Sequence, residues 1–265
     1  MKELWALYLL LLIGIAVRFR IWKPMLIWRK PWEVVQNVRE RGDSCTLTLK
    51  PSGHEGFTFE AGQFAWLNTG KTPFNRDQHP ISLSSCAYDE PGREIAFTIK
   101  SLGDWSSRTV AALGPGKKVW VDGPYGVFTA DREQGPGYVF IAGGVGITPF
   151  FSTCLTFAQR GDQRPVFLFY AGKTFESLTF REQLDALQSR MNLKIIYVLQ
   201  DPGLDWQGER GFITAEVLKR HLPGQFKRMQ YFLCGSGPMM DSIEEILPNL
   251  DVRAELIHTE RFDMV

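Results

Sequence analysis

The chain has 265 residues, of which 44% are hydrophobic and 22% are charged, and its formal net charge is +1 at pH 7. This near-neutral balance provides no electrostatic attraction for a polyanion, so nucleic acid is not an expected partner. The four cysteines, Cys45, Cys86, Cys154 and Cys234, lie far apart and lack iron–sulfur spacing. No metal site is expected.

The first residues have the composition of a membrane helix. Residues 4–17 (LWALYLLLLIGIAV) form an uncharged apolar run, which as a helix would be about 21 Å long against about 30 Å for the hydrocarbon core of a bilayer. A signal peptide would need a small-residue cleavage site after this run, and RFR at 18–20 is not one. A buried core helix would be amphipathic, whereas this run is apolar on all sides.

We therefore predict a membrane helix, or the stump of a membrane domain, over residues 1–23. Phe19, Ile21 and Trp22 extend the apolar run, and the neighbouring arginines can snorkel to the interface. Because basic residues are enriched on the cytoplasmic side of membrane helices, we expect the rest of the chain to face the cytoplasm. The basic residues concerned are Arg18, Arg20, Lys23, Arg29 and Lys30.

Residues 31–130 have the pattern of an antiparallel β-barrel. Turns that contain Gly, Pro and Asp separate six short strand-like runs, a spacing typical of a barrel or a sandwich. One helix is expected to interrupt them at residues 105–113, with Asp104 as its N-cap. The strand-like runs are WEVVQNV, SCTLTLK, FTFEAGQFAWL, HPISLSS, EIAFTIK and KKVWVDG.

Residues 137–265 alternate between strand and helix patterns, after a linker at 131–137. Such alternation predicts an α/β domain, in which helices cover both faces of a parallel sheet. The predicted strands are YVFIA, VFLFYA, KIIYVLQ, QYFLC and AELIHTE. The predicted helices between them are PFFSTCLTFAQR, LTFREQLDALQSR, TAEVLKRHL and PMMDSIEEIL.

A glycine-rich loop follows the first strand of this α/β domain. Ligands of open α/β sheets bind beyond the carboxyl ends of the strands, and glycines let a pyrophosphate approach the backbone there. Thr148 can cap the following helix, and Pro149 fits its first turn. By itself the loop could also be an ordinary tight turn. The glycines of the loop are Gly143, Gly144 and Gly146.

A second loop repeats the order strand, Gly-x-Gly, proline, helix. It consists of Gly235, Gly237 and Pro238, directly after Cys234. Two such loops in one parallel sheet indicate an extended ligand that lies across it. No His and Asp partners for Cys234 are evident, so a protease-type nucleophile is not favoured. Its thiol either lines a dry pocket or belongs to the core.

Lys173 follows the second strand of the α/β domain, where an NAD-binding unit would have an acidic residue for the ribose 2′-OH. A cation there could bind a 2′-phosphate, which favours NADP and leaves NAD possible. Glu176 nearby makes this signal ambiguous, and Lys173 could equally be a solvated loop residue.

In chain order the motifs resemble the ferredoxin–NADP reductase superfamily, and within it the dehydrogenase part of membrane flavoproteins of the ferric reductase and NADPH oxidase type. Each motif is weak alone, whereas their order is highly specific and covers nearly everything after residue 31. The motifs are GQF at 62–64, HPISLSS at 79–85, KSLGDWS at 100–106, GPYG at 123–126, GGVGITP at 143–149, CGSGP at 234–238 and ERF at 260–262.

The resemblance implies a barrel that holds FAD and an α/β domain that holds NADP or NAD. Ser82 would lie near the flavin N5, Cys234 beside the nicotinamide, and Phe262 on the flavin ring where the nicotinamide enters. Ile81 stands where the family usually has an aromatic residue against the flavin. Isoleucine can cover the flavin ring but cannot stack on it. The residues implied to bind FAD are His79, Pro80, Ile81, Ser82, Lys100, Gly103, Ser106 and Phe262. Those implied to bind the nicotinamide nucleotide are Gly143, Gly144, Gly146, Thr148, Pro149, Lys173, Cys234, Gly235, Gly237 and Pro238.

The expected reaction passes hydride from NAD(P)H to FAD and then single electrons to an acceptor, with the cofactors carrying the chemistry. In the family that acceptor is haem within a membrane domain. Because the chain has only four histidines and none in its N-terminal helix, we expect the haem in a longer protein or in a partner, with ferric iron or oxygen as the final acceptor. Two alternatives are a free-standing reductase that supplies a soluble oxygenase and a non-catalytic nucleotide-sensing subunit.

Overall fold

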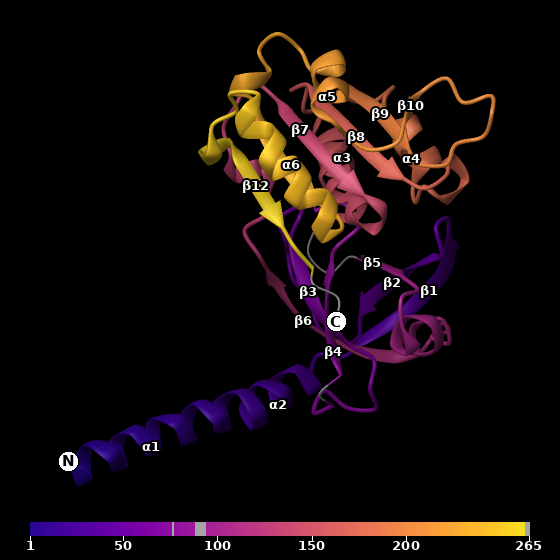
Figure 1. The fold of residues 1–265 in the computed structure, drawn as a ribbon. Coiled ribbons are helices and arrows are strands. Elements are labelled where there is room, and N and C mark those ends of the chain that lie inside the picture. Colours follow the sequence, from indigo (N-terminus) through magenta and orange to yellow (C-terminus); the bar gives the residue numbers. More distant parts are fainter. Residues whose placement is uncertain (76, 88–93, 263–265) are drawn as a thin grey trace.

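The N-terminal helix stands apart from the folded body. The computed structural model describes residues 1–75, 77–87 and 94–262. In it, α1 (Lys2–Val17) continues through a π-helical turn (Arg18–Trp22) into α2 (Lys23–Trp28). This continuous helix projects away from the rest of the chain (Figure 1), and no side chain of α1 is buried. Within the described part of the chain it is the one helix that is long and apolar enough to cross a membrane.

The predicted antiparallel barrel is confirmed. Its six strands pair in the order β4-β3-β6-β1-β2-β5, and a bridge between Leu83 and Phe97 joins the chain after β4 to β5, so that the sheet closes on itself. Alternate side chains point inward, where Leu47, Leu49 and Phe97 are fully buried. The strands are β1 (Trp32–Glu40), β2 (Ser44–Pro51), β3 (Phe64–Asn68), β4 (Gln78–Ser82), β5 (Ile95–Lys100) and β6 (Lys118–Tyr125).

Two local expectations for the barrel were wrong. The run 57–67 forms a strand only from Phe64, because Gly62 turns the chain with φ +100° so close to the Phe128 carbonyl that a Cβ would collide with it. The helix after β5 is a short π-helix (Trp105–Val110), and Asp104 does not cap it. The hydroxyl of Ser106 instead accepts the backbone N–H groups of Leu102 and Gly103.

The α/β part is a six-stranded parallel sheet in the order β10-β9-β8-β7-β11-β12. It lies above the barrel in Figure 1. The predicted strand 254–260 forms only from Ile257, after a 3₁₀ turn. The strands are β7 (Tyr138–Gly143), β8 (Val166–Gly172), β9 (Leu193–Leu199), β10 (Glu209–Arg210), β11 (Gln230–Cys234) and β12 (Ile257–Glu260).

Helices cover both faces of this sheet, as the alternating pattern predicts. Successive side chains of strand β7 point to opposite faces of the sheet. Phe140 packs into the core cluster on one face, and Ile141 packs into the cluster on the other face. Helices α3 (Thr148–Arg160) and α4 (Arg181–Leu187) bury their apolar residues against the first face. Helices α5 (Ala215–His221) and α6 (Gly237–Asn249) bury theirs against the second. Apolar burial on both faces stabilises the sheet.

The strand order has a switch point at the centre of the sheet. From β7 the chain proceeds outward through β8 and β9 on one side, and it returns to place β11 and β12 on the other side. The direction of winding therefore reverses between β7 and β11, which is the position where open α/β sheets bind ligands. Both glycine loops lie at this position, since they follow β7 and β11.

Candidate functional site

The two glycine loops form one structure at the reversal point. Cys234 of β11 lies opposite Ala142 of β7 in the parallel register, so both loops begin at the same level. A Cβ on Gly146 would collide with the Cys234 carbonyl, and a Cβ on Gly235 would lie 3.1 Å from the Gly143 backbone nitrogen. The backbones of the two loops therefore pack directly against each other, which only glycine permits.

The outer face of the first loop remains open. Gly144 adopts φ +56°, a conformation that favours glycine, and an added Cβ there would meet only the Lys100 ammonium, at 4.0 Å. The Tyr170 hydroxyl donates to the Gly144 carbonyl from beneath at 3.2 Å. Lys100 belongs to β5 of the barrel, so a barrel cation reaches the glycine loop of the α/β part.

The N-termini of the two helices that follow the glycine loops differ from expectation in one helix cap. Pro149 does lie in the first turn of α3, as predicted. Thr148 does not cap the helix, because its hydroxyl donates to the Val145 carbonyl at 2.7 Å and Ile147 precedes the first helical residue. In the second loop, Pro238 lies in the first turn of α6 and Gly237 has open space around it. The two helix N-termini give both loops a partial positive charge.

Cys234, which is buried, and Glu260, which is half-buried, lie beside the second loop at matching positions of β11 and β12. Burial, with the nearby Glu260 carboxylate, raises the pKa of the Cys234 thiol to about 12, so it is a neutral thiol at pH 7. Burial also raises the pKa of Glu260 to about 7. Its Oε2 atom is buried and has no hydrogen-bond partner among the residues that the structure describes.

Phe262 lies between the two parts of the molecule. Its ring meets the ring of Phe64 on β3 edge to face, with centroids 6.2 Å apart. Phe64 pairs with Ser82 of β4 in the antiparallel register, and Ser82 is buried. The Glu260 carboxylate reaches the same corner, 3.7 Å from the Cβ position of Gly126. The predicted residues Ser82, Cys234 and Phe262 thus converge on one region from three different strands or strand ends.

The second predicted group gathers around the π-helix of the barrel. The His79 and Trp105 rings stack with centroids 3.7 Å apart, and the Trp105 indole donates to Thr69 at 2.9 Å. Burial lowers the pKa of His79, against the opposing charge of Asp77. Ser106 is buried with its hydroxyl bonded within the turn, so it shapes the turn, and Gly103 remains open to a ligand.

The remaining predicted residues occupy the edges of the site. Ile81 is half-buried and packs against the barrel core, next to Pro80 on the short strand β4. Lys173 is exposed just beyond β8, and its carbonyl accepts the Asp201 N–H at 2.8 Å. Lys173 is therefore free to meet a ligand but is not held in place by one of the described side chains.

Sequence reasoning assigned no role to Glu260 or Phe64, although both lie within quoted motifs. A glutamate near a chain end usually indicates a solvated residue. Only the packing of β12 beside β11, with Phe262 on Phe64, buries that carboxylate. The signal that could have identified Phe64 was its alternation with Ala65, which places it outside the barrel core.

Comparisons with known proteins agree with this geometry. The family model described as an oxidoreductase NAD-binding domain matches residues 140–245. NADH-cytochrome b5 reductase 1 of Candida albicans is 33% identical over 142 residues, which cover 52% of this chain and 48% of that relative. Ferredoxin–NADP reductase B of Sorangium cellulosum is 29% identical over 225 residues, 82% of this chain and 91% of that protein.

The structural match extends over both parts of the molecule. The FAD/NAD-binding domain of a nitric oxide dioxygenase from Vibrio cholerae superposes with a TM-score of 0.77 at 23% identity, over 88% of this chain and 98% of that one. Barrel and α/β sheet are thus shared as one arrangement. The chain belongs to the ferredoxin–NADP reductase superfamily.

Membership confirms the expected cofactor pair at the level of the superfamily, whose members use FAD and NAD(P). The match spans only about half the length of the Candida relative. The names of the relatives include both NADH and NADP enzymes, so the choice between the two nucleotides depends on this chain's own residues. The assignment of individual residues stays a prediction, as do the boundaries at 31–130 and 137–265.

Proposed function

We propose that this chain is an NAD(P)H-dependent flavin oxidoreductase that binds FAD on the barrel and the nicotinamide nucleotide across the two glycine loops. When both are bound, NAD(P)H supplies a hydride to the flavin, and the flavin supplies single electrons to an acceptor. The observation that carries the proposal is the convergence of Ser82, Cys234 and Phe262 beside the paired loops.

The residues present fit these cofactors. Gly144 and Gly237 leave open space above backbone N–H groups at two helix N-termini, which suits a pyrophosphate. Lys100 adds a cation beside the first loop. The Oε2 atom of Glu260, which has no hydrogen-bond partner among the described residues, is a buried polar atom that can bond a carboxamide group. On the barrel, Gly103 and the His79–Trp105 stack offer a second place for phosphate groups.

The protein's own contribution at the reacting end is positioning and water exclusion. The neutral Cys234 thiol fills apolar space without adding charge. Ser82 can donate its hydroxyl from β4. Phe262 covers this end, and because its ring packs on Phe64 from a position just after β12, it can move aside without breaking a strand.

The acceptor that we propose is haem in a membrane domain or partner, with ferric iron or oxygen at the end of the chain of electron transfer. The exposed apolar helix α1 supports a membrane location with the flavin site on the cytoplasmic side. The names of two relatives, NADH-cytochrome b5 reductase 1 and flavohemoprotein, refer to haem proteins, which supports haem as the acceptor. This chain's four histidines do not lie in the N-terminal helix.

The test is anaerobic reduction of the flavin-loaded chain by NADPH or NADH, with Lys173→Ala and the control Lys194→Ala. Lys194 is also exposed but lies at the opposite, amino-terminal end of a strand. We expect Lys173→Ala to slow reduction by NADPH about tenfold, the loss typical of one charge-assisted phosphate contact, and to leave NADH unchanged. Equal rates of reduction in the wild type and both variants would rule out a 2′-phosphate role for Lys173. If neither nucleotide bleached the flavin, the proposed oxidoreductase function would be refuted.

A further inference from the structure

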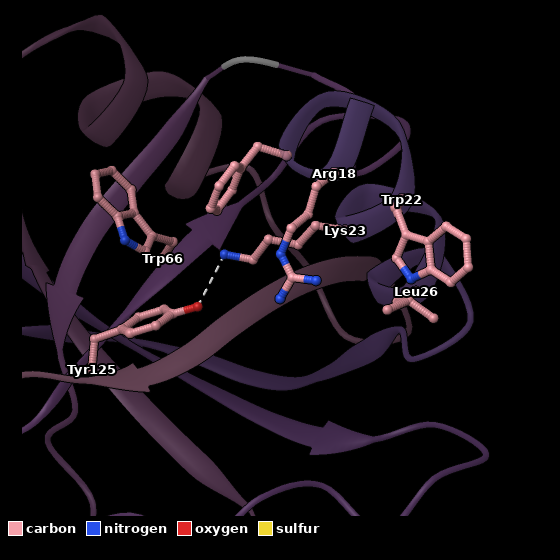
Figure 2. Close-up of a pocket in the computed structure, with 7 residues that line it drawn as sticks. Arg18, Trp22, Lys23, Leu26, Trp66 and Tyr125 are labelled. Atoms are coloured by element: carbon pink, nitrogen blue, oxygen red, sulfur yellow. Dashed lines mark hydrogen bonds between the residues drawn. The ribbon is translucent and has the colours of Figure 1, made fainter. Parts of the chain in front are cut away.

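A pocket lies between the N-terminal helix and the outer face of the barrel (Figure 2). Its volume of about 470 Å³ is within the range of small-molecule sites. Arg18, Phe19, Trp22 and Lys23 line it from the helix, and Trp66 of β3 and Tyr125 of β6 line it from the barrel. The pocket is outside the flavin and nucleotide regions described above.

Among the residues that the structure describes, Arg18 is a positively charged residue of this pocket with no opposite charge paired to it. Lys23 forms an ion pair with Asp122 and donates to the Tyr125 hydroxyl at 3.0 Å. The Tyr125 hydroxyl in turn donates to Asp122 at 2.8 Å, so these three groups satisfy one another. Arg18 has no ion pair or hydrogen bond with any of the residues that the structure describes. Arg18 lines the pocket together with Lys23 and Tyr125 (Figure 2).

The pocket begins where the apolar part of the helix ends. Every residue of α1 is exposed, and Arg18 follows it directly. Pro24 is the first buried residue of the helix, which is where it meets the barrel. If α1 lies in a bilayer, Arg18 and Trp22 are at the depth of the lipid headgroups, where arginine and tryptophan are enriched.

We propose that this pocket binds an anionic phospholipid of the cytoplasmic leaflet. The Arg18 guanidinium bonds the headgroup phosphate, for which its planar fork is suited. Phe19 and Trp22, which line the same pocket, contact the glycerol backbone of the lipid. The proposal goes beyond the redox function and rests only on the membrane location of the helix.

Lipid bound here would brace the helix against the flavin side of the barrel. Tyr125 lines the pocket, and its ring lies 6.1 Å from the ring of Phe64. Phe64 in turn contacts Phe262. The headgroup therefore occupies the junction that sets how the flavin region faces the membrane.

The test uses the full chain in dodecyl maltoside micelles, titrated with phosphatidylglycerol or phosphatidylcholine. The apparent dissociation constant comes from the rise in unfolding temperature. The variants are Arg18→Gln, Arg18→Lys and the control Arg29→Gln, which removes the same charge from an exposed residue outside the pocket. We expect Arg18→Gln to weaken phosphatidylglycerol binding about tenfold, Arg18→Lys less, and Arg29→Gln less than twofold.

Four results would overturn the proposal. Equal losses in Arg18→Gln and Arg29→Gln would indicate general charge attraction, and equal binding of phosphatidylcholine would remove the requirement for an anion. The same Arg18-dependent stabilisation by inorganic phosphate would indicate a free anion instead of a lipid. An intact chain that stays in solution without detergent and does not float with vesicles would place the pocket away from any membrane. None of these readouts involves flavin or NAD(P)H, so they are independent of the proposed redox function.

Discussion

At the scale of single residues, burial determines the charge of the groups beside the second glycine loop. Cys234 and Glu260 lie at matching positions of neighbouring strands, and both are pushed toward their neutral forms. A neutral thiol and a carboxyl group that is about half protonated at pH 7 present hydrogen-bonding groups with less local charge than an ordinary glutamate would. This environment suits a ligand group that changes its own charge during a reaction.

The Glu260→Gln substitution tests this environment through pH. Below the ordinary pKa of a glutamate, the Glu260 carboxyl is neutral in both the folded and the unfolded chain. Between that value and about 7 only the unfolded chain loses the proton, so the wild type loses stability as pH rises, and the whole penalty is present above pH 7. We expect Glu260→Gln to be more stable than wild type at pH 8, by up to about 3 kcal/mol.

Thermal unfolding of the cofactor-free chain in detergent, from pH 4 to pH 8, measures this difference. The two proteins should converge near pH 4, where the glutamate is neutral and similar in shape to glutamine. A constant difference across this range would show that the substitution acts through packing and that the carboxyl is not desolvated.

At the scale of elements, the loops after β7 and β11 are joined by backbone contact. Gly146 packs on the Cys234 carbonyl, and Gly235 packs near the Gly143 nitrogen. The two loops can therefore keep a fixed spacing, which a ligand that bridges them requires. Side chains at these positions would push the loops apart.

The Gly146→Ala substitution should separate the two loops. Its Cβ would collide with a backbone carbonyl that belongs to a central strand, so we expect a loss of about 1–3 kcal/mol in the free energy of unfolding and weaker nucleotide binding. Gly224→Ala is the matched control, since nothing lies within 4 Å of a Cβ at that position, which is in the α/β part but outside both glycine loops. Denaturant unfolding and nucleotide titration measure both effects, and equal behaviour of the two variants would contradict the contact between the loops.

At the scale of the whole molecule, α3 connects the α/β part to the barrel. Its Ser152 hydroxyl donates to the Ser85 carbonyl at 2.6 Å, and the Ala87 N–H donates to the Thr156 hydroxyl at 2.9 Å. Ser152 and Thr156 are both buried. Because α3 starts at the first glycine loop, these bonds relate the position of that loop to the barrel strand that carries Ser82.

The Thr156→Val substitution tests this connection. It removes the acceptor for the Ala87 N–H and leaves that group unpaired, so we expect a cost of about 1–3 kcal/mol and faster hydrogen exchange at Ala87. Thr153→Val is the control, because Thr153 is equally buried on the same helix but bonds only to Pro149 within it. Unchanged exchange at Ala87 in Thr156→Val, or equal effects of both variants, would count against the connection.

Much of the molecule was predictable from local pattern. Strand-like runs separated by turns indicated the six barrel strands. After residue 137, alternating strand and helix patterns indicated a parallel sheet covered by helices. The glycine loops and Pro149 were evident as motifs. Helix caps were less predictable, because Asp104 and Thr148 had bonding alternatives that depend on the neighbouring turns.

The order of the elements, the spacing of their apolar residues and the positions of the glycine loops could be predicted from local sequence, because each depends on residues that are neighbours along the chain. Tertiary packing places β11 beside β7 and brings Phe262 to Phe64, and it leaves the Oε2 atom of Glu260 without a hydrogen-bond partner among the residues that the structure describes. It also decided that Arg18 faces a pocket on the barrel. These facts depend on which distant segments pack together, and the burial and desolvation that result are properties of the packed whole.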